Sequence, residues 1–303
     1  MNKITAYDIA QMIDHSLLNP KFTRQEVEAG CRLAAEYECI TVCVKPCDVR
    51  LAYGILKDTR VLTTTVIGFP HGSNLAEIKV AETKRAIDEG CKEIDMVINI
   101  GRFLSGDYNL VQDDIAAVCE ETHRGKAILK VILENAYLSA EQIKKACELC
   151  VATGADFTKS STGYAPYGAR ICDLRIMRAS TPPSMQVKAA GGVRTLDDAL
   201  SVRAIGVTRF GCTTTAQMIQ EARKREASGE LIVPIPENVQ ELSYLKSAAA
   251  PQVKGSVPGL IIERDVIKAL MQNEKTLYCT IKGIISPAAA DLAKEKGITI
   301  SRL

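Results

Sequence analysis

Eight short runs of apolar and β-branched residues, separated by stretches of helical period, constrain the fold of this chain most strongly. Runs that are apolar on both faces are typical of strands buried on both sides of a parallel sheet. Their alternation with amphipathic helices predicts an α/β protein, and eight such units most simply close into a (β/α)8 TIM barrel. The expected strands span residues 12–15, 39–45, 61–68, 94–99, 127–133, 155–159, 185–190 and 207–211.

Two of the intervening segments carry clear helix signals. Residues 74–90 begin with Asn74 as an expected cap, and residues 139–154 begin at Ser139 and end at Gly154. An open, doubly wound sheet is the main alternative, but no G-x-G-x-x-G pattern follows an early strand. The sequence therefore favours the closed barrel.

The charge balance bears on the kind of partner. Lys and Arg number 38 against 36 Asp and Glu, which gives a net charge of +2, and no block of like charge suggests a nucleic-acid or membrane surface. No apolar run reaches the ~20 residues of a membrane span, and the N-terminus lacks the apolar stretch of a signal peptide. We expect a cytoplasmic protein with a small-molecule partner and neither a nucleic-acid nor a membrane partner.

Cysteine and histidine placement argues against a metal site. The 11 cysteines are dispersed through apolar segments, and an odd count in a cytoplasmic chain favours free, buried thiols. Cys147 and Cys150 lie two residues apart in a helical pattern, without the second pair that a structural zinc site needs. His15, His71 and His123 are far apart in sequence. We expect no metal and no cofactor.

Charged residues interrupt several of the expected strands. Asp95, Lys130, Lys159 and Lys188 all stand in otherwise apolar runs. Such groups are costly to bury unless they face one another across a polar pocket, and in a barrel that pocket lies at the carboxyl ends of the strands. A structural salt bridge remains open for Asp95 or Lys130, and Lys159 could also extend its ammonium group to water.

Lys159 is the main candidate for covalent chemistry. It ends the run ADFTK, and a buried lysine tends to lose its proton and become a nucleophile, as Schiff-base lysines do. Lys188, in VKAAGGVR, would place a second positive charge at the same barrel mouth and depress one of the two pKa values.

Two glycine-rich turns follow the seventh and eighth expected strands. Gly191 and Gly192 belong to the first turn, and Gly211 and Thr213 belong to the second. Loops at these two places often form the phosphate site of a barrel, with free N–H groups and a helix N-terminus directed at the anion. The sequence therefore predicts a phosphorylated ligand.

The segments EIDMVIN, KVILEN, DFTKSSTG, VKAAGGVR and RFGCTT occur in this order, after IDHSLLNP and VCVKP. Together they resemble the 2-deoxyribose-5-phosphate aldolases over residues 5–229. The resemblance implies a (β/α)8 barrel that reversibly cleaves 2-deoxy-D-ribose 5-phosphate into D-glyceraldehyde 3-phosphate and acetaldehyde without a metal. We also expect a homo-oligomer, a dimer or higher.

The resemblance also implies roles for individual residues. Lys159 would be the Schiff-base nucleophile, Lys188 the neighbour that keeps it deprotonated, and Asp95 the acid/base group acting through a water. The residues expected to hold the phosphate are Gly163, Gly191, Gly192, Gly211 and Thr213, and those expected to line the pocket or support the catalytic groups are Asp14, Cys43, Lys130 and Thr162. Cys43 fits plain core packing equally well.

Two tyrosines mark departures from the family pattern. Tyr164 stands where some members have a lysine after STG, so that one phosphate contact is missing or replaced by a hydroxyl. Some members also end in a tyrosine-bearing tail that assists proton transfer. This chain continues instead, with Tyr244 as a speculative substitute.

The chain after the barrel is expected to form a linker and a small α+β appendage. Residues 1–229 would be the barrel, the proline-containing residues 230–258 the linker, and residues 259–303 the appendage. In the appendage we expect a helix at 262–271, a strand at 276–281, a helix at 287–296 begun by Ser286, and a strand at 297–300.

The appendage resembles short modules at the ends of bacterial microcompartment-associated proteins, on the pattern ERDVIKAL…ISPAAADLAKEKGI. This resemblance implies targeting into a microcompartment or assembly with a partner there. An extension that only stabilises an oligomer is the alternative.

A class I aldolase acting on deoxyribose phosphate is the leading hypothesis for the whole chain. A Schiff-base aldolase for another phosphosugar is the alternative among enzymes. The alternative from another class is a catalytically silent barrel that binds phosphosugars or serves as a microcompartment scaffold.

Overall fold

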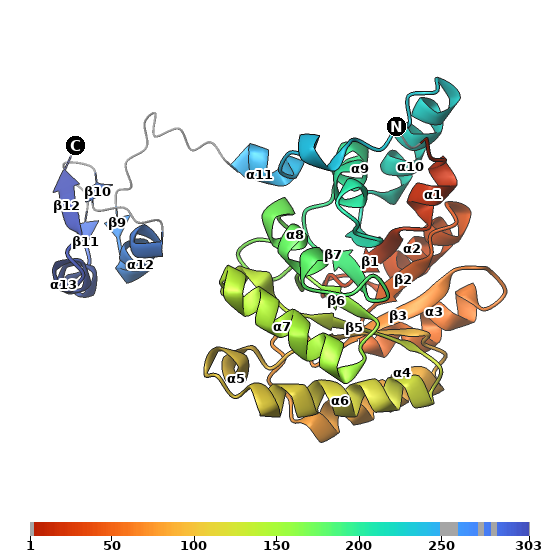
Figure 1. Cartoon of the computed structure of the whole chain (residues 1–303), viewed down its shortest axis with the longest axis horizontal. Helices are drawn as coiled ribbons and strands as arrows, with labels where there is room; N and C mark the ends of the chain where they lie inside the picture. The colour runs from red at the N-terminus through yellow and green to blue at the C-terminus, as the bar shows by residue number, and fades with distance from the viewer. Residues whose placement is uncertain (1–2, 249–259, 272–275, 280–283, 303) are drawn as a thin grey trace. The chain divides into compact units, whose positions relative to one another are not determined.

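The structure is a computed structural model that describes residues 3–248, 260–271, 276–279 and 284–302 (Figure 1). It divides into two compact units, Met1–Ser247 and Ala248–Leu303. The first unit holds a barrel, and the second is a small α+β module.

Eight parallel strands close into a barrel in which each strand pairs with its neighbours in chain order. This confirms the predicted (β/α)8 fold, and each strand lies within two residues of its expected ends. The strands are β1 (Ile13–Leu17), β2 (Thr41–Val44), β3 (Leu62–Ile67), β4 (Glu93–Val97), β5 (Ile128–Ile132), β6 (Phe157–Lys159), β7 (Gln186–Ala189) and β8 (Arg209–Cys212).

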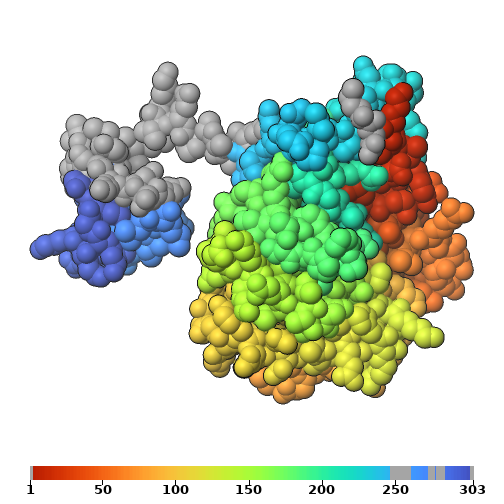
Figure 2. All heavy atoms as spheres, in the orientation of Figure 1, coloured from red at the N-terminus to blue at the C-terminus, as the bar shows by residue number. Residues whose placement is uncertain are grey.

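Helices surround the barrel and connect its strands (Figure 1). They are α1 (Ala6–Ala10), α2 (Arg24–Glu36), α3 (Val49–Leu56), α4 (Ala76–Asp88), α5 (Ile100–Leu104), α6 (Tyr108–Arg124), α7 (Ala140–Thr153), α8 (Ile171–Ala179), α9 (Leu196–Ala204), α10 (Thr215–Ala227) and α11 (Ser243–Ala248), with short 3-10 turns η1 (Pro46–Asp48), η2 (Asn135–Tyr137) and η3 (Pro236–Asn238). In the space-filling view, yellow to green atoms, the colours of the residues from α6 to α8, form a continuous surface on the face toward the viewer (Figure 2).

Capping residues set the ends of several helices. Ser139 caps α7 in a reciprocal box with Gln142, and Gly154 ends the helix at φ 76°, as predicted. The predicted Asn74 cap of α4 is wrong, because that helix begins one residue later. Its N-cap is Leu75, which makes no side-chain cap hydrogen bond.

The strands divide their side chains between two environments. In β4, Ile94 and Met96 are fully buried among apolar residues, whereas Glu93 and Asp95 form ion pairs with basic side chains of other strands. Because successive side chains on a strand point to opposite faces, the first pair packs under the helices and the second pair lies inside the barrel. The barrel interior is therefore polar at this level.

Residues 230–247 differ from the expected linker, because they pack on the barrel. Leu231 and Leu242 are buried in the main core, and Lys3 and Ile232 form an antiparallel bridge. The boundary between the two units lies at Ser247 rather than Gly229. Residues 249–258 of the expected linker lie outside the described residues.

The second unit contains β9 (Leu260–Ile261), α12 (Glu263–Met271), β10 (Thr276–Cys279), β11 (Ile284–Ile285), α13 (Pro287–Glu295) and β12 (Thr299–Arg302). Strand β9 pairs with β11, and β10 pairs with β12, each pair in parallel. Ser286 caps α13 as predicted. Residues 280–281, the end of one expected strand, lie outside the described part. The core of this unit consists of Ile261, Val266, Ala269, Ala289, Ala293 and Ile298.

The ten cysteines whose side chains the structure describes are all free thiols. Eight are buried, which fits the predicted packing role, while Cys47 and Cys172 are exposed. Cys147 and Cys150 lie buried in α7, where burial raises the pKa of both thiols. Within the described ranges, none of the helices is long and apolar enough to cross a membrane.

Candidate active site

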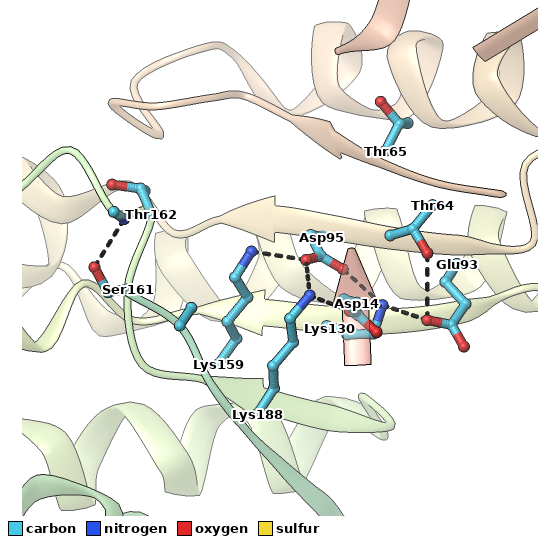
Figure 3. A network of polar contacts seen from close by, with 12 residues as sticks. Asp14, Thr64, Thr65, Glu93, Asp95, Lys130, Lys159, Ser161, Thr162 and Lys188 are labelled. Carbon is cyan, nitrogen blue, oxygen red and sulfur yellow. Dashed lines mark hydrogen bonds and ion pairs between the residues drawn. The ribbon is translucent and has the colours of Figure 1, made fainter. Parts of the chain in front are cut away.

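Lys159 and Lys188 occupy neighbouring positions at the carboxyl ends of β6 and β7. The strand register pairs them directly, and the two residues are only 3% and 1% exposed. Both extend toward Asp95 rather than toward solvent (Figure 3). The two amines therefore share one buried environment, as the sequence predicts.

A single carboxylate oxygen links the two lysines. Asp95 Oδ2 accepts hydrogen bonds from Lys159 Nζ and from Lys188 Nζ, each at 2.7 Å. The other oxygen, Oδ1, accepts from Lys130 Nζ at 2.8 Å. Asp95 is fully buried, and its position is fixed by the Nζ atoms of three lysines.

Further charged side chains of the barrel interior extend this network away from Lys159. Lys188 Nζ also donates to Asp14, and the Arg209 guanidinium bridges Asp14 and Glu93 at 2.8 Å each. Lys130 Nζ lies 2.5 Å from Glu93 Oε2.

In this network the three carboxylates of Asp14, Glu93 and Asp95 meet four basic groups, those of Lys130, Lys159, Lys188 and Arg209. The charges balance if one base is neutral. A buried cluster is costly when it carries net charge. The count therefore favours one unprotonated base.

The electrostatic surroundings indicate which base that is. Burial lowers the pKa of Lys159, the nearby Lys188 lowers it further, and the opposing attraction of Asp95 does not restore it. Burial also lowers the pKa of Lys188, but Asp14 and Asp95 raise it above its ordinary value. Of the two amines, Lys159 therefore loses its proton more readily, and Lys188 holds its proton more tightly.

Asp95 is ionised in this arrangement. Burial alone would raise the pKa of its carboxyl group, but Lys130, Lys159 and Lys188 together hold that pKa well below the usual range. A carboxylate of this kind begins a reaction as a proton acceptor.

A cavity of about 370 Å³ opens above these groups. Ten of the twelve residues that the sequence singles out line it: Asp14, Cys43, Lys159, Thr162, Gly163, Lys188, Gly191, Gly192, Gly211 and Thr213. The other two, Asp95 and Lys130, lie beneath and hold the lysines and each other in place. Burial raises the pKa of the Cys43 thiol to about 11, so this group is protonated at neutral pH.

The loop after β6 is held by internal hydrogen bonds. Thr162 donates through its N–H and its hydroxyl to the Glu134 carboxylate. The Gly163 N–H donates to Ser161 Oγ at 2.9 Å, and the Tyr164 N–H donates to Thr162 Oγ1 at 3.0 Å. Both amides are already bonded, so Gly163 contributes room for a ligand rather than a hydrogen bond.

Tyr164 reaches across the barrel mouth. Its hydroxyl donates to the Leu18 carbonyl at 3.0 Å, and its ring packs edge-on against Phe69 with 5.6 Å between centroids. Leu18 and Tyr164 also line a second, largely apolar recess of about 350 Å³, together with Phe69, Val66 and Pro70. Tyr164 therefore lies between the main cavity and this recess, and its hydroxyl is bonded to the Leu18 carbonyl.

The loops after β7 and β8 also line the cavity. Gly191 and Gly192 have φ values of 74° and 106°, a region that favours glycine. Thr214 Oγ1 donates to the Arg194 carbonyl at 2.8 Å and so joins the two loops. Thr213 lines the cavity just before α10, and the N-terminus of that helix favours an anion there.

Several contributors were not among the predicted site residues. Glu134 and Arg209 hold Thr162 and Asp14, and residues 18–20 line the cavity from the loop after β1. Arg209 begins a strand otherwise made of small and apolar residues, so a charged residue in an apolar run was the available signal. The residues after β1 carry no comparable signal.

Across the described residues, no three His, Cys, Asp or Glu side chains are grouped so that they could hold a metal ion.

Comparison with known proteins identifies a matching family. Residues 9–211 match the family described as DeoC/LacD family aldolase. The chain is 45% identical over 222 residues to the deoxyribose-phosphate aldolase of Thermoanaerobacter sp. (strain X514), a match that covers 73% of this chain and 100% of that protein.

Solved structures agree with this match. The structure is similar to a putative deoxyribose-phosphate aldolase from Coccidioides immitis, with a TM-score of 0.70, 37% identity, and coverage of 74% of this chain and 88% of the other. It is also similar to a deoxyribose phosphate aldolase from Aeropyrum pernix described as a tetramer, with a TM-score of 0.67, 26% identity, and coverage of 72% and 92%.

Proposed function

The chain belongs to the DeoC/LacD family of aldolases, and from this premise we propose that it is a class I deoxyribose-phosphate aldolase whose Schiff-base lysine is Lys159. One observation carries the assignment of the lysine. Lys159 Nζ lines the cavity, its pKa is lowered, and it lies 2.7 Å from a carboxylate oxygen that also binds the charged Lys188. The lowered pKa increases the fraction of neutral amine, which is the form that attacks a carbonyl.

The reaction begins when the neutral Lys159 amine adds to C1 of open-chain 2-deoxy-D-ribose 5-phosphate. The carbinolamine hydroxyl takes up one proton and leaves as water, which gives a protonated imine; hydrolysis at the end of the cycle returns this proton. The proton of the C3 hydroxyl is then removed, the bond between C2 and C3 breaks, and its electron pair moves into the imine, which forms an enamine. D-Glyceraldehyde 3-phosphate leaves at this step.

Completion of the cycle requires one proton and one water. The enamine takes a proton at C2, and hydrolysis of the resulting imine releases acetaldehyde and the free Lys159 amine. Asp95 lies within hydrogen-bond reach of Lys159 Nζ and is ionised, so it can accept protons and return them through a water. Lys188 keeps its charge and thereby holds the pKa of Lys159 down.

The phosphate of the substrate is proposed to lie between the loops after β7 and β8. Gly191, Gly192, Gly211 and Thr213 line this end of the cavity, and α10 directs its N-terminus toward it. Thr162 and Gly163 border the same space from the loop after β6.

The assay that tests this function measures acetaldehyde release from 2-deoxy-D-ribose 5-phosphate. We expect the wild-type chain to release acetaldehyde, and we expect Lys159→Leu to be inactive but folded, because the variant keeps the size of the side-chain stem and loses the nucleophile. Turnover by Lys159→Leu near the wild-type rate would contradict the assignment. Reversible binding of the phosphosugar without turnover by the wild-type chain would favour a silent binding or scaffold barrel.

Oligomeric state and location are part of the proposal. We propose a homo-oligomer, supported by the tetramer described for the Aeropyrum pernix relative, and a cytoplasmic location. The C-terminal unit is proposed to bind a bacterial microcompartment partner. Its supports are the sequence resemblance and the outward apolar side chains of α12, Ile267 at 44% and Met271 at 83% exposed.

Co-sedimentation with isolated microcompartments tests the role of the C-terminal unit. The full chain should sediment with them, whereas a chain that ends after Ala248 should not. Equal sedimentation of the two chains would contradict the targeting role and favour an extension that stabilises the oligomer.

A further inference from the structure

Residues 241–244, here called the clasp, connect the segment after β6 with the loop after β7, and both of these border the cavity. They lie directly after the barrel, at the start of α11, and each member contacts a different part of the barrel unit. Leu242 is fully buried in the main core and anchors the segment.

Ser243 binds the helix that follows the loop after β7. Its N–H and hydroxyl donate to the Asp198 carboxylate at 2.7 and 2.6 Å. The same carboxylate accepts from the backbone N–H groups of Arg194 and Thr195 at 3.1 and 3.0 Å. Burial would raise the pKa of Asp198, but these donors lower it, so the group is ionised and gathers all four hydrogen bonds.

Tyr244 contacts both loops. Its hydroxyl donates to the Ala169 carbonyl at 2.8 Å, in the segment after β6. Its ring fills the place where a side chain at Gly192 would begin, since a Cβ built there would lie 2.1 Å from the ring. The Arg194 guanidinium lies 5.6 Å from the ring centroid. Burial raises the pKa of Tyr244 to about 12, so the hydroxyl remains a donor.

The two loops also meet each other beside Tyr244. The Ala169 N–H donates to the Gly191 carbonyl at 2.7 Å, and a Cβ built at Gly168 would lie 2.2 Å from that oxygen. Glu241 completes the clasp, because its carboxylate accepts from the Cys172 N–H at 3.3 Å at the start of α8. Both loops and the helices after them are thus attached to one short segment.

We propose that the clasp is a positioning element for substrate phosphate, with Ser243 and Tyr244 as its positioning residues. The proposal rests on the proposed function, because it assumes that Gly191 and Gly192 border the phosphate. Glycine-rich loops have high conformational freedom, and fixing them in advance reduces the ordering cost that binding would otherwise carry. Neither residue is needed for chemistry at Lys159.

The test uses full-length variants and two substrates. Tyr244→Ala and Ser243→Ala are compared with wild type and with Glu237→Ala. Glu237 is a control at an exposed position of η3, shortly before the clasp. For 2-deoxy-D-ribose 5-phosphate we expect KM to rise by roughly tenfold in Tyr244→Ala and by roughly threefold in Ser243→Ala, on the scale of one or two lost hydrogen bonds. For unphosphorylated 2-deoxy-D-ribose, kcat/KM of both variants should stay within about twofold of wild type. In Glu237→Ala, kcat/KM for each of the two substrates should also stay within about twofold of wild type.

Equal loss with both substrates would overturn the proposal, because it would show a general structural role, and so would an unchanged KM for the phosphorylated sugar. Ser243→Ala is the milder change and keeps the test decisive if Tyr244→Ala does not fold.

Calorimetric binding of inorganic phosphate separates this proposal from the catalytic one. A wild type that binds phosphate but cleaves neither sugar would refute the aldolase function. In that case, weaker phosphate binding by Tyr244→Ala than by wild type would still support the positioning role of the clasp. Equal phosphate binding by wild type and Tyr244→Ala would refute the positioning role of the clasp.

Discussion

At the scale of single residues, the site depends on an asymmetry between two lysines that the sequence makes alike. Lys159 and Lys188 share one Asp95 oxygen, but only Lys188 also pairs with Asp14. That second carboxylate raises the pKa of Lys188, whereas burial and the Lys188 charge lower the pKa of Lys159. The difference between nucleophile and neighbour is therefore set by one additional ion pair.

This asymmetry predicts a pH dependence. Activity needs a neutral Lys159, so kcat/KM should fall as pH drops through the Lys159 pKa, which lies below its ordinary value of 10.5. Lys188→Leu removes the nearby positive charge, so the Lys159 pKa should rise and the acidic limb should move to higher pH. Activity near pH 7 should fall by about 100-fold or more.

A pH–rate profile of wild type, Lys188→Leu and Lys188→Arg checks this expectation. The arginine variant keeps the charge and should leave the limb closer to its wild-type position. A limb that does not move in Lys188→Leu would show that Lys188 does not control the Lys159 pKa.

The sequence could predict most of these residues but not their partnerships. Lys159, Lys188 and Asp95 were identifiable because charged groups in apolar strands are costly unless they meet. Nothing in the order of residues shows that Asp14, which is distant in sequence on β1, forms an ion pair with Lys188 rather than with Lys159. Such pairings depend on the closure and register of the barrel.

At the scale of helices and strands, strong local sequence signals predicted the ends of elements correctly. Ser139 and Gly154 mark the ends of α7, whereas β9 and β11 have two residues each and are too short to leave a period in the sequence. The proline-containing residues after Gly229 looked like a linker. Their attachment depends on single buried side chains such as Leu231 and Leu242, which composition does not reveal.

The buried His15, where β1 contacts α10, predicts that the free energy of unfolding falls in acid. His15 is buried, and its ring nitrogen Nδ1 lies 2.9 Å from Thr215 Oγ1. Burial lowers the pKa of His15 from 6.5 to about 4. The unfolded chain therefore binds more protons than the folded chain between these values, so the free energy of unfolding should fall as pH drops from about 6.5 toward 4.

Denaturant unfolding of wild type and His15→Gln between pH 4 and 7 measures this effect. The histidine contributes a decrease of at most about 1.4 kcal/mol per pH unit in that window, which should be absent in the variant. Parallel pH dependence of the two proteins would contradict a buried, neutral His15.

At the scale of the whole molecule, the two units have separate cores. The buried apolar cluster of the barrel includes Leu242 as its last member along the chain, and the cluster of the second unit begins at Ile261. The candidate active site lies wholly within Met1–Ser247. We therefore expect the first unit to catalyse the reaction without the second.

A chain that ends after Ala248 should accordingly keep kcat and KM for 2-deoxy-D-ribose 5-phosphate within about twofold of the full chain, because it keeps both the cavity and the clasp. Steady-state kinetics and a thermal unfolding curve of the two chains check this expectation. A tenfold loss of activity in a folded, shortened chain would show that the C-terminal unit takes part in catalysis.

The central claim is that the buried Lys159 amine forms a covalent imine with the substrate carbonyl. Borohydride reduction of the wild-type chain in the presence of acetaldehyde, followed by mass spectrometry of its peptides, tests it most directly. The account predicts one ethyl group on Lys159 and none in the Lys159→Leu variant. Modification of Lys188 or Lys130 with Lys159 left intact, or no adduct in a chain that cleaves the sugar phosphate, would contradict it.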